Sequence, residues 1–201
     1  MTGRQRAEGR GQKHVVGRWL LCALPSALCA LLFVGCGILK RVPNTFYTLD
    51  TIPAETRVAR TGAPVGLDTI ELPPGIERRG IVLRGADNKL EVRGTHQWAS
   101  PLEEMVLHTL AFDLANRLPE GLIVLPGQPR PSGARSLAVT FEDLAPGADG
   151  VFVLDARWTI GDGASHHERI TVPMASSESP AVVTGMSQAL AMLADRIAAG
   201  M

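Results

Sequence analysis

The sequence WASPLEEMVLHTLAFDLANRL, residues 98–118, sets the architecture expected for this chain. Ser100 is a suitable N-cap, Pro101 suits the first helical position, and Glu103 follows three residues after the serine, as in a capping box. Apolar side chains recur every four residues, at Leu102, Val106, Leu110, Leu114 and Leu118. This spacing predicts a long helix with a broad apolar face, which Pro119-Glu120-Gly121 would end.

A second amphipathic helix is expected near the end of the sequence. Ser179-Pro180 offers a cap followed by a favourable first helical residue. The segment after it carries one apolar stripe: Val182, Met186, Leu190, Leu193 and Ile197. Because an amphipathic helix must bury its apolar side against another element, the two helices together predict a sheet for them to cover.

Short segments rich in apolar and β-branched residues predict the strands of that sheet. They are Phe46–Asp50, Val65–Leu72, Ile81–Arg84, Lys89–Arg93, Leu122–Leu125, Ser136–Leu144, Val151–Ile160 and Glu168–Met174. Loops rich in proline and glycine separate them, and Gly85–Asn88 reads as a hairpin turn. We therefore predict an α/β (α+β) fold in which a mixed β-sheet is covered by two main helices. The two β-rich halves look similar, each ending in a helix, and the strand order does not follow from the sequence.

The N-terminal segment predicts export. Residues 19–34 carry no charge and follow an arm with five basic residues and one acid, as in the n-region and h-region of a signal peptide. The run ends in Phe33-Val34-Gly35-Cys36, which resembles the lipobox of bacterial lipoproteins. The resemblance implies diacylglyceryl transfer to the Cys36 thiol, cleavage between Gly35 and Cys36, and acylation of the new N-terminus. Phe33 departs from the aliphatic residue usual at its position.

The alternative is an uncleaved membrane helix, because residues 19–39 are uncharged over a length that can cross a bilayer. Pro25 inside the run and the basic pair Lys40-Arg41 beyond it favour cleavage instead. With either a cleaved signal peptide or an uncleaved membrane helix, the rest of the chain is expected to be exported. We expect a signal peptide at 1–35, a lipidated tether at 36–45 and one domain at 46–201.

Charge and cysteine content narrow the class of protein. Residues 1–35 hold five basic residues and one acidic, so their removal leaves 15 of the 20 basic and 19 of the 20 acidic residues, a net charge of −4. A weakly acidic body argues against nucleic acid as a partner. Cys22 and Cys29 lie in the removed segment and Cys36 would carry lipid, so no disulfide is expected.

The order of motifs in the mature chain resembles the ABC-type transport auxiliary lipoprotein family. The resemblance rests on Leu72–Arg84, in which a Leu-Pro strand end precedes a basic residue and an Ile-Val pair, on Leu90, and on the Trp-Ala-x-Pro-Leu helix start at Trp98–Leu102. Phe46–Leu49, the strand around Trp158 and the Ala/Leu-rich terminal helix also match, so the resemblance covers nearly all of 36–199. Pro74-Gly75 departs from the pattern and leaves the conformation of that loop open.

The resemblance implies a non-catalytic component of a transporter in which an inner-membrane ABC complex works with MCE-domain proteins to move lipids or other hydrophobic molecules. It also allows a homo-oligomeric ring. Gly37, rather than aspartate, follows Cys36, which favours the periplasmic face of the outer membrane, with the inner membrane as the alternative. Alternative functions are a lipid-tethered periplasmic enzyme and an envelope-assembly lipoprotein that aids lipopolysaccharide insertion.

Candidate contact residues come from the one concentration of basic residues in the mature N-terminal half. Arg78, Arg79 and Arg84, with Arg93 nearby, can contact an acidic partner or lipid headgroups, or can form a solvated loop. Trp98 can anchor an interface, although a tryptophan directly before a helix start more often packs beneath it. Trp158, in the middle of a strand, is expected in the core.

Catalytic and metal chemistry is weakly indicated. His166 and Glu168 would share a strand face that excludes His167, and Glu104 and His108 are spaced four apart on a helix, but solvated polar residues are the default for both pairs.

A triad of Ser100, His96 and Asp87 lacks the nucleophile-elbow motif, and the chain has no P-loop or dinucleotide fingerprint. We expect no enzyme activity, no metal and no cofactor beyond the covalent lipid on Cys36.

Overall fold

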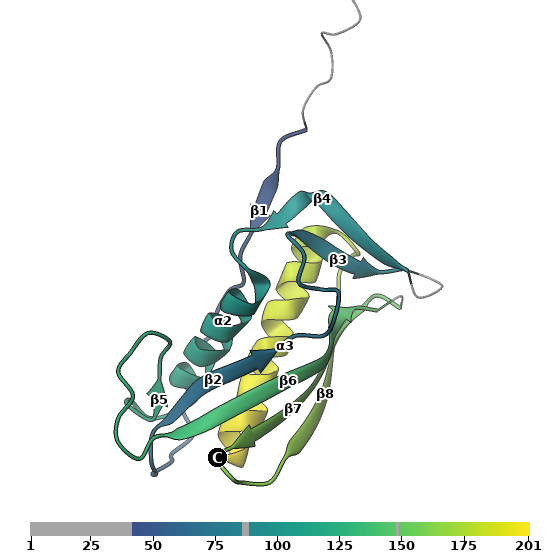
Figure 1. Ribbon diagram of the computed structural model, residues 1–201. Coiled ribbons are helices and arrows are strands. Elements are labelled where there is room, and N and C mark those ends of the chain that lie inside the picture. The colour runs from purple at the N-terminus through teal and green to yellow at the C-terminus, as the bar shows by residue number, and fades with distance from the viewer. Residues whose placement is uncertain (1–41, 86–88, 148) are drawn as a thin grey trace, which may run out of the picture. The chain divides into compact units, whose positions relative to one another are not determined.

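The structure is a computed structural model that describes residues 42–85, 89–147 and 149–201. Gly35 and Cys36, the turn residue Asp87 and the whole expected signal peptide lie outside the described residues. The strands are β1 (Thr45–Tyr47), β2 (Val65–Glu71), β3 (Gly80–Arg84), β4 (Leu90–Trp98), β5 (Ile123–Val124), β6 (Arg135–Pro146), β7 (Val151–Ile160) and β8 (His166–Pro173). The helices are α2 (Leu102–Arg117) and α3 (Ser179–Gly200) (Figure 1).

The strands form two mixed sheets rather than one. The larger has the order β5-β2-β6-β7-β8, with β2 parallel to both of its neighbours and the other pairs antiparallel. The smaller has the order β1-β4-β3, with β1 parallel to β4 and the predicted hairpin between β3 and β4. The mixed α+β class is confirmed. The halves share their element order but not their pairing, because β2 leaves the first half to join the strands of the second.

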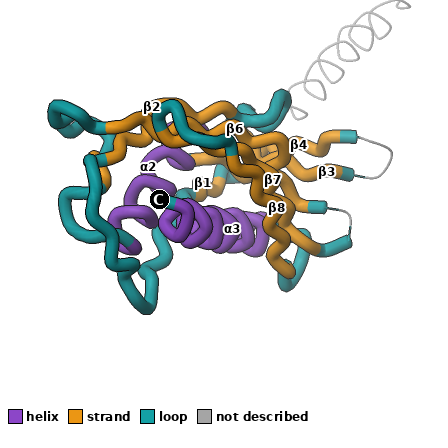
Figure 2. The backbone as a smooth tube through the Cα atoms, turned by 90° about the horizontal axis from the view of Figure 1, so that it is seen from below, coloured by secondary structure: helices purple, strands orange, loops and turns teal. Residues whose placement is uncertain are grey.

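Both helices lie on the same side of the five-stranded sheet (Figure 2). The two predicted apolar stripes are buried there, with no member more than 5% exposed. Strand β6 alternates as a half-covered sheet requires: Leu137, Val139 and Phe141 point into the core between residues that face the other way. In β7, residues 152–156 are all buried. Trp158 is 3% exposed, which confirms its predicted place in the core.

Both helix starts differ from the prediction. Pro101, not Ser100, is the N-cap of α2: its ψ is 132°, and its carbonyl accepts the first helical hydrogen bond, from Met105. The residues before it are not helical, because the amides of Trp98 and Ala99 donate to the carbonyls of Arg79 and Tyr47.

Ser179 is likewise not a cap, since Glu178 holds that position in α3. The Ser179 hydroxyl instead bonds Arg93 and His96 of β4. Neither helix has a side-chain cap hydrogen bond.

Candidate functional site

A surface cleft of about 570 Å³ lies between the β2–β3 loop and the start of α2. It brings together Arg78, Arg79 and Trp98, three of the four contact residues chosen from the sequence. The rest of the lining is Glu77 from the loop and the short segment from Ala99 to Glu103. Arg84, the fourth chosen residue, does not line this cleft.

The β2–β3 loop is held in place by a buried side chain and a glycine. Ile76 is 6% exposed and belongs to the core, so it anchors the loop between the exposed residues Pro74 and Glu77. Gly75 has φ +91°, a conformation that side-chain-bearing residues rarely adopt. The Pro74-Gly75 departure seen in the sequence therefore supplies the turn that lets Ile76 reach the core. Beyond it, the carbonyl of Arg79 accepts a 2.9 Å hydrogen bond from the amide of Trp98.

The charges of the cleft are mixed. Arg78 and Arg79 are exposed, and so are Glu77 and Glu103. The first turn of α2 adds a partial positive charge, which Glu103 and Glu104 oppose. Two guanidinium groups and two carboxylates in one opening match a protein surface of complementary mixed charge better than a simple anion.

Trp98 lies beneath the helix start, as its position before α2 indicated. Its side chain is 4% exposed, and its indole nitrogen has no hydrogen-bond partner among the residues that the structure describes. The indole therefore supports the wall of the cleft and offers little surface to a ligand.

Arg84 and Arg93 join elements of the fold. The Arg84 guanidinium donates to both carboxylate oxygens of Asp143 at 2.8 Å, which links β3 to β6. This hydrogen bonding with Asp143 raises the pKa of Arg84 above its ordinary value. Arg93 pairs with Glu178 at 3.3 Å and donates to Ser179 Oγ at 3.1 Å, so it links β4 to the start of α3. The Arg84 side chain remains 44% exposed, and its contact with a partner stays a prediction.

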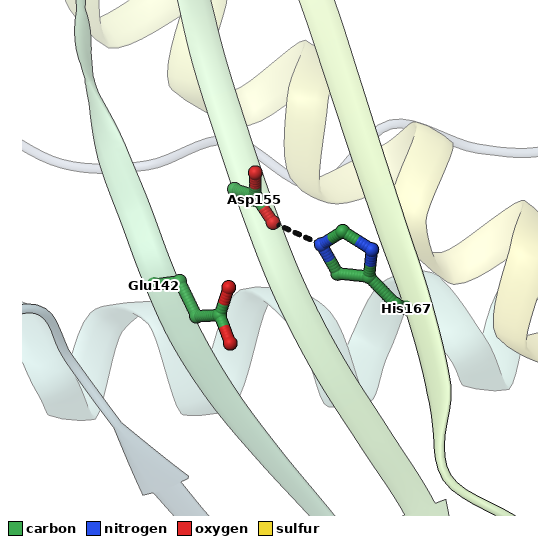
Figure 3. Close-up of side chains that lie close together, drawn as sticks. All are labelled: Glu142, Asp155 and His167. Atoms are coloured by element: carbon green, nitrogen blue, oxygen red, sulfur yellow. Dashed lines mark hydrogen bonds and ion pairs between the residues drawn. The ribbon is translucent and has the colours of Figure 1, made fainter.

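A second polar cluster lies on the face of the five-stranded sheet away from the helices (Figure 3). Glu142 of β6, Asp155 of β7 and His167 of β8 bring one ligand atom each within 4.8 Å of one another. His167 Nε2 is 2.5 Å from Asp155 Oδ1. These atoms are of kinds that divalent metals bind, but each carboxylate already has an arginine: Arg169 is 2.8 Å from Asp155, and Arg157 is 2.5 Å from Glu142. The cluster is therefore a charge-balanced network on the open sheet face.

The cluster contains neither member of the His166 and Glu168 pair considered from the sequence, for which solvated polar residues were the default expectation. His166 and Glu168 share a face, as expected, but His166 stacks on Trp158 with ring centroids 4.0 Å apart, and Glu168 lies 3.9 Å from Arg196. His167, which the prediction excluded, meets the carboxylates. Its partners come from two neighbouring strands, and the strand order did not follow from the sequence.

The remaining candidates that the structure describes make hydrogen bonds within the fold. His108 Nδ1 donates to the backbone carbonyl of Glu104 at 2.8 Å, a contact within the helix surface. His96 Nδ1 lies 2.8 Å from Ser179 Oγ and 3.2 Å from the Tyr47 hydroxyl. Asp87, the third member of the conceivable triad, is outside the described residues.

Asp113 of α2 is a buried titratable group that the sequence reading missed. It is fully buried, and burial raises its pKa to about 6, although a hydrogen bond from Ile52 and the charge of Arg117 oppose this shift. The Ile52 amide donates to Asp113 Oδ1 at 2.8 Å, and Arg117 donates to the Ile52 carbonyl at 3.0 Å. The sequence does contain a signal for this buried acid, because Asp113 lies between Leu110 and Leu114 of the apolar stripe. The Ile52 bonds and the 2.7 Å bond from the Val58 amide to the Arg117 carbonyl fasten residues 50–58 to α2, and the Asp50 amide donates to Ser187 Oγ of α3 at 3.1 Å.

Neither helix of the described segments combines the length and apolar character that crossing a bilayer requires.

Comparison with known proteins places the chain in a family. Residues 47–198 match the family described as the ABC-type transport auxiliary lipoprotein component. The chain is 23% identical over 145 residues to the intermembrane transport lipoprotein PqiC of Escherichia coli K12, covering 71% of this chain and 73% of that one. The match to PqiC of Shigella flexneri has the same values.

Two crystal structures share the fold. One, of an uncharacterized protein, has a TM-score of 0.65 and 22% identity and covers 79% of this chain and 99% of its own. The other, from Xanthomonas campestris, has a TM-score of 0.58 and 15% identity and covers 77% and 92%. The expected resemblance is thereby confirmed, and the chain belongs to the ABC-type transport auxiliary lipoprotein family.

Proposed function

We propose that this chain is a non-catalytic auxiliary component of an intermembrane transport system, anchored by lipid on Cys36 at the periplasmic face of the outer membrane. The observation that carries the proposal is the family match over residues 47–198. It begins directly after the segment 36–45 that we propose as the lipidated tether, with residues 1–35 as the signal peptide. The two relatives are named intermembrane transport lipoproteins, which agrees with this role.

The physics of lipid transfer explains why such a component is useful. Each methylene group exposed to water costs about 0.8 kcal/mol, so a lipid must cross the periplasm in a shielded route. A domain tethered to the receiving membrane keeps its docking surface at a high local concentration near the end of that route. The proposed partners are an MCE-domain protein that forms the route and the ABC complex that drives it, with a homo-oligomeric ring of this chain as one form of the dock.

The cleft formed by Arg78, Arg79 and Trp98 is the proposed partner contact. Its two arginines and two glutamates are exposed beside a rigid helix start, and such mixed charge suits recognition of another protein surface. Arg84 lies on the following strand and would extend the same basic side, although it already pairs with Asp143.

Co-purification tests the partner. Full-length tagged protein should retain an MCE-domain protein from gently solubilised membranes, and the Arg78→Glu/Arg79→Glu variant should retain at most about a tenth as much. Arg135→Glu, on an exposed position of β6, is the matched control and should behave as the parent. Parent protein that recovers no envelope partner, even after mild crosslinking, would contradict the proposal.

Labelling tests the anchor and its address. Palmitate should enter the parent protein and not the Cys36→Ser variant, and mass spectrometry should find an acylated Cys36 as the first residue. Separation of inner and outer membranes should place the parent in the outer fraction. An unlabelled parent, or a variant whose location is unchanged, would remove the lipid anchor from the proposal.

A further inference from the structure

The outer face of the three-stranded sheet carries an apolar strip along β1 and β4. Phe46, Leu90 and Val92 are 56%, 49% and 48% exposed. Val92 pairs with Val82 of β3, and Phe46 pairs with Gln97 of β4, which lies beyond a register shift between Gly80 and Ile81. Phe46 alternates with Tyr47, which packs on the core, so Phe46 faces outward like Leu90 and Val92. Arg84 pairs with Leu90 on the same side. The opposite face, with Ile81 and Leu83, belongs to the hydrophobic core.

The strip is unusual for a strand in the middle of a sheet. Most of β4 is exposed or half-buried, although it has a neighbour on each side. Within the described part of the chain, the exposed sides of Phe46, Leu90 and Val92 are left to solvent. Exposed apolar side chains that gather on one face, unlike single ones, mark a surface that meets another apolar phase.

The surroundings of the strip are basic. Lys89 precedes Leu90 directly, and Arg78 and Arg79 lie in the loop that leads into β3; all three are exposed. The loop approaches the strip closely, because a Cβ atom placed on Gly75 would lie 3.2 Å from Leu90 Cδ1. Among the described residues of these segments, Glu77 and Glu91 are the exposed acids, and Arg84 is already paired with Asp143. Basic residues beside exposed apolar ones complement an anionic lipid surface.

The proposed tether at 36–45 would limit how far this face lies from a bilayer. Phe46 follows Cys36 by ten residues, so even a fully extended chain separates them by roughly 35 Å at most. No other sheet or helix begins closer to the anchor among the residues described, since β1 is the first element. In Figure 1, β1, β4 and β3 lie together at the end of the domain where α3 starts.

We propose that the outer face of the three-stranded sheet rests on the anionic phospholipid surface to which Cys36 is anchored, with Phe46, Leu90 and Val92 entering the interfacial region. The inference rests on the proposed lipid anchor and adds an orientation to it. The domain is then held at two points, and its cleft and helices keep a fixed direction relative to the membrane. A fixed direction favours the docking of a rigid transport conduit because less orientational freedom is lost.

Tryptophan reporters test the contact. The full chain, purified in detergent, is reconstituted into vesicles of phosphatidylethanolamine and phosphatidylglycerol that contain brominated lipid. The reporters are Phe46→Trp and Leu90→Trp, with Phe112→Trp on α2, 43% exposed in the parent, as the matched control. Fluorescence of the parent's own tryptophans sets the baseline. Quenching at positions 46 and 90 should exceed that at position 112 about threefold, and phosphatidylcholine vesicles should reduce the difference.

Equal quenching at all three positions would overturn the inference. A second result would also overturn it: no quenching by brominated lipid at positions 46 and 90, together with protection from acrylamide that increases with protein concentration. This result would assign the strip to contact with a second copy of the chain. Palmitate labelling of the same preparation reports the anchor separately, so a missing anchor and a missing contact are told apart. The second reporter, Leu90→Trp, decides the outcome if the Phe46→Trp variant does not fold.

Discussion

The buried carboxylate of Asp113 accepts a 2.8 Å hydrogen bond from the backbone amide of Ile52, 61 residues earlier in the chain. This bond fastens the segment between β1 and β2 to α2. Arg117 Nη1 lies 3.8 Å from the same Oδ1 atom, and Asp113 Oδ2 has no hydrogen-bond partner among the described residues. The connection is therefore specific but costs desolvation when the carboxylate is charged.

The pH dependence of stability should reflect this cost. Burial raises the pKa of Asp113 from 3.8 to about 6, so the folded state binds more protons than the unfolded state between these values. The contribution of Asp113 to the free energy of unfolding is therefore full below pH 3.8 and is lost as pH rises through 6. About two pKa units correspond to about 3 kcal/mol at most.

The Asp113→Asn variant should remove this dependence while its amide oxygen still accepts from Ile52. Urea unfolding at pH 4 and pH 7 should show that the variant loses less stability than the parent over this interval. Asp162→Asn, in an exposed turn, should leave the difference unchanged. An identical pH profile for Asp113→Asn and the parent would contradict the raised pKa.

The Arg84–Asp143 pair should stabilise the contact between the two sheets modestly. Both hydrogen bonds are 2.8 Å, but the side chains are 44% and 18% exposed, so water screens the attraction. A double-mutant cycle with alanine at both positions should give a coupling of roughly 0.5–1 kcal/mol that decreases in high salt. A coupling of zero at low salt would mean that the pair does not join the sheets.

Gly75→Ala should destabilise the domain by roughly 1–3 kcal/mol, because alanine is strained at φ +91° and its Cβ would crowd Leu90. Gly62→Ala is the control, since nothing lies within 4 Å of its added Cβ and its φ is not positive. Thermal unfolding compares the two variants. Equal melting temperatures would show that the loop at Pro74-Gly75 adopts another conformation.

The Glu142–Asp155–His167 cluster should not retain a divalent metal at micromolar concentration, because Arg157 and Arg169 already neutralise its carboxylates. Equimolar zinc should leave the melting temperature of the parent protein unchanged. The Arg157→Ala/Arg169→Ala variant should melt at a higher temperature with zinc than without it. Adding His167→Ala to that variant should abolish this increase. Calorimetric titration with zinc measures both. Tight binding of zinc to the parent protein would show that the metal displaces Arg157 and Arg169 from the carboxylates.

Local patterns in the sequence were sufficient to predict both helices, eight strands and the family. Apolar spacing of four along 102–118 and 182–197 depends only on the geometry of a helix, and it located the buried faces correctly. The resemblance in the loop and helix start led to the family that the comparison confirmed.

The tertiary structure alone decided what depends on distant partners. Strand pairing produced two sheets where one was expected, and it placed His167, rather than His166, beside Asp155. Hydrogen bonds from the Trp98 and Ala99 amides moved the start of α2 past Ser100, and burial under residues 50–58 gave Asp113 its raised pKa. These features could not be predicted because each is set by neighbours that lie far away along the chain, and the local pattern does not encode which strands meet.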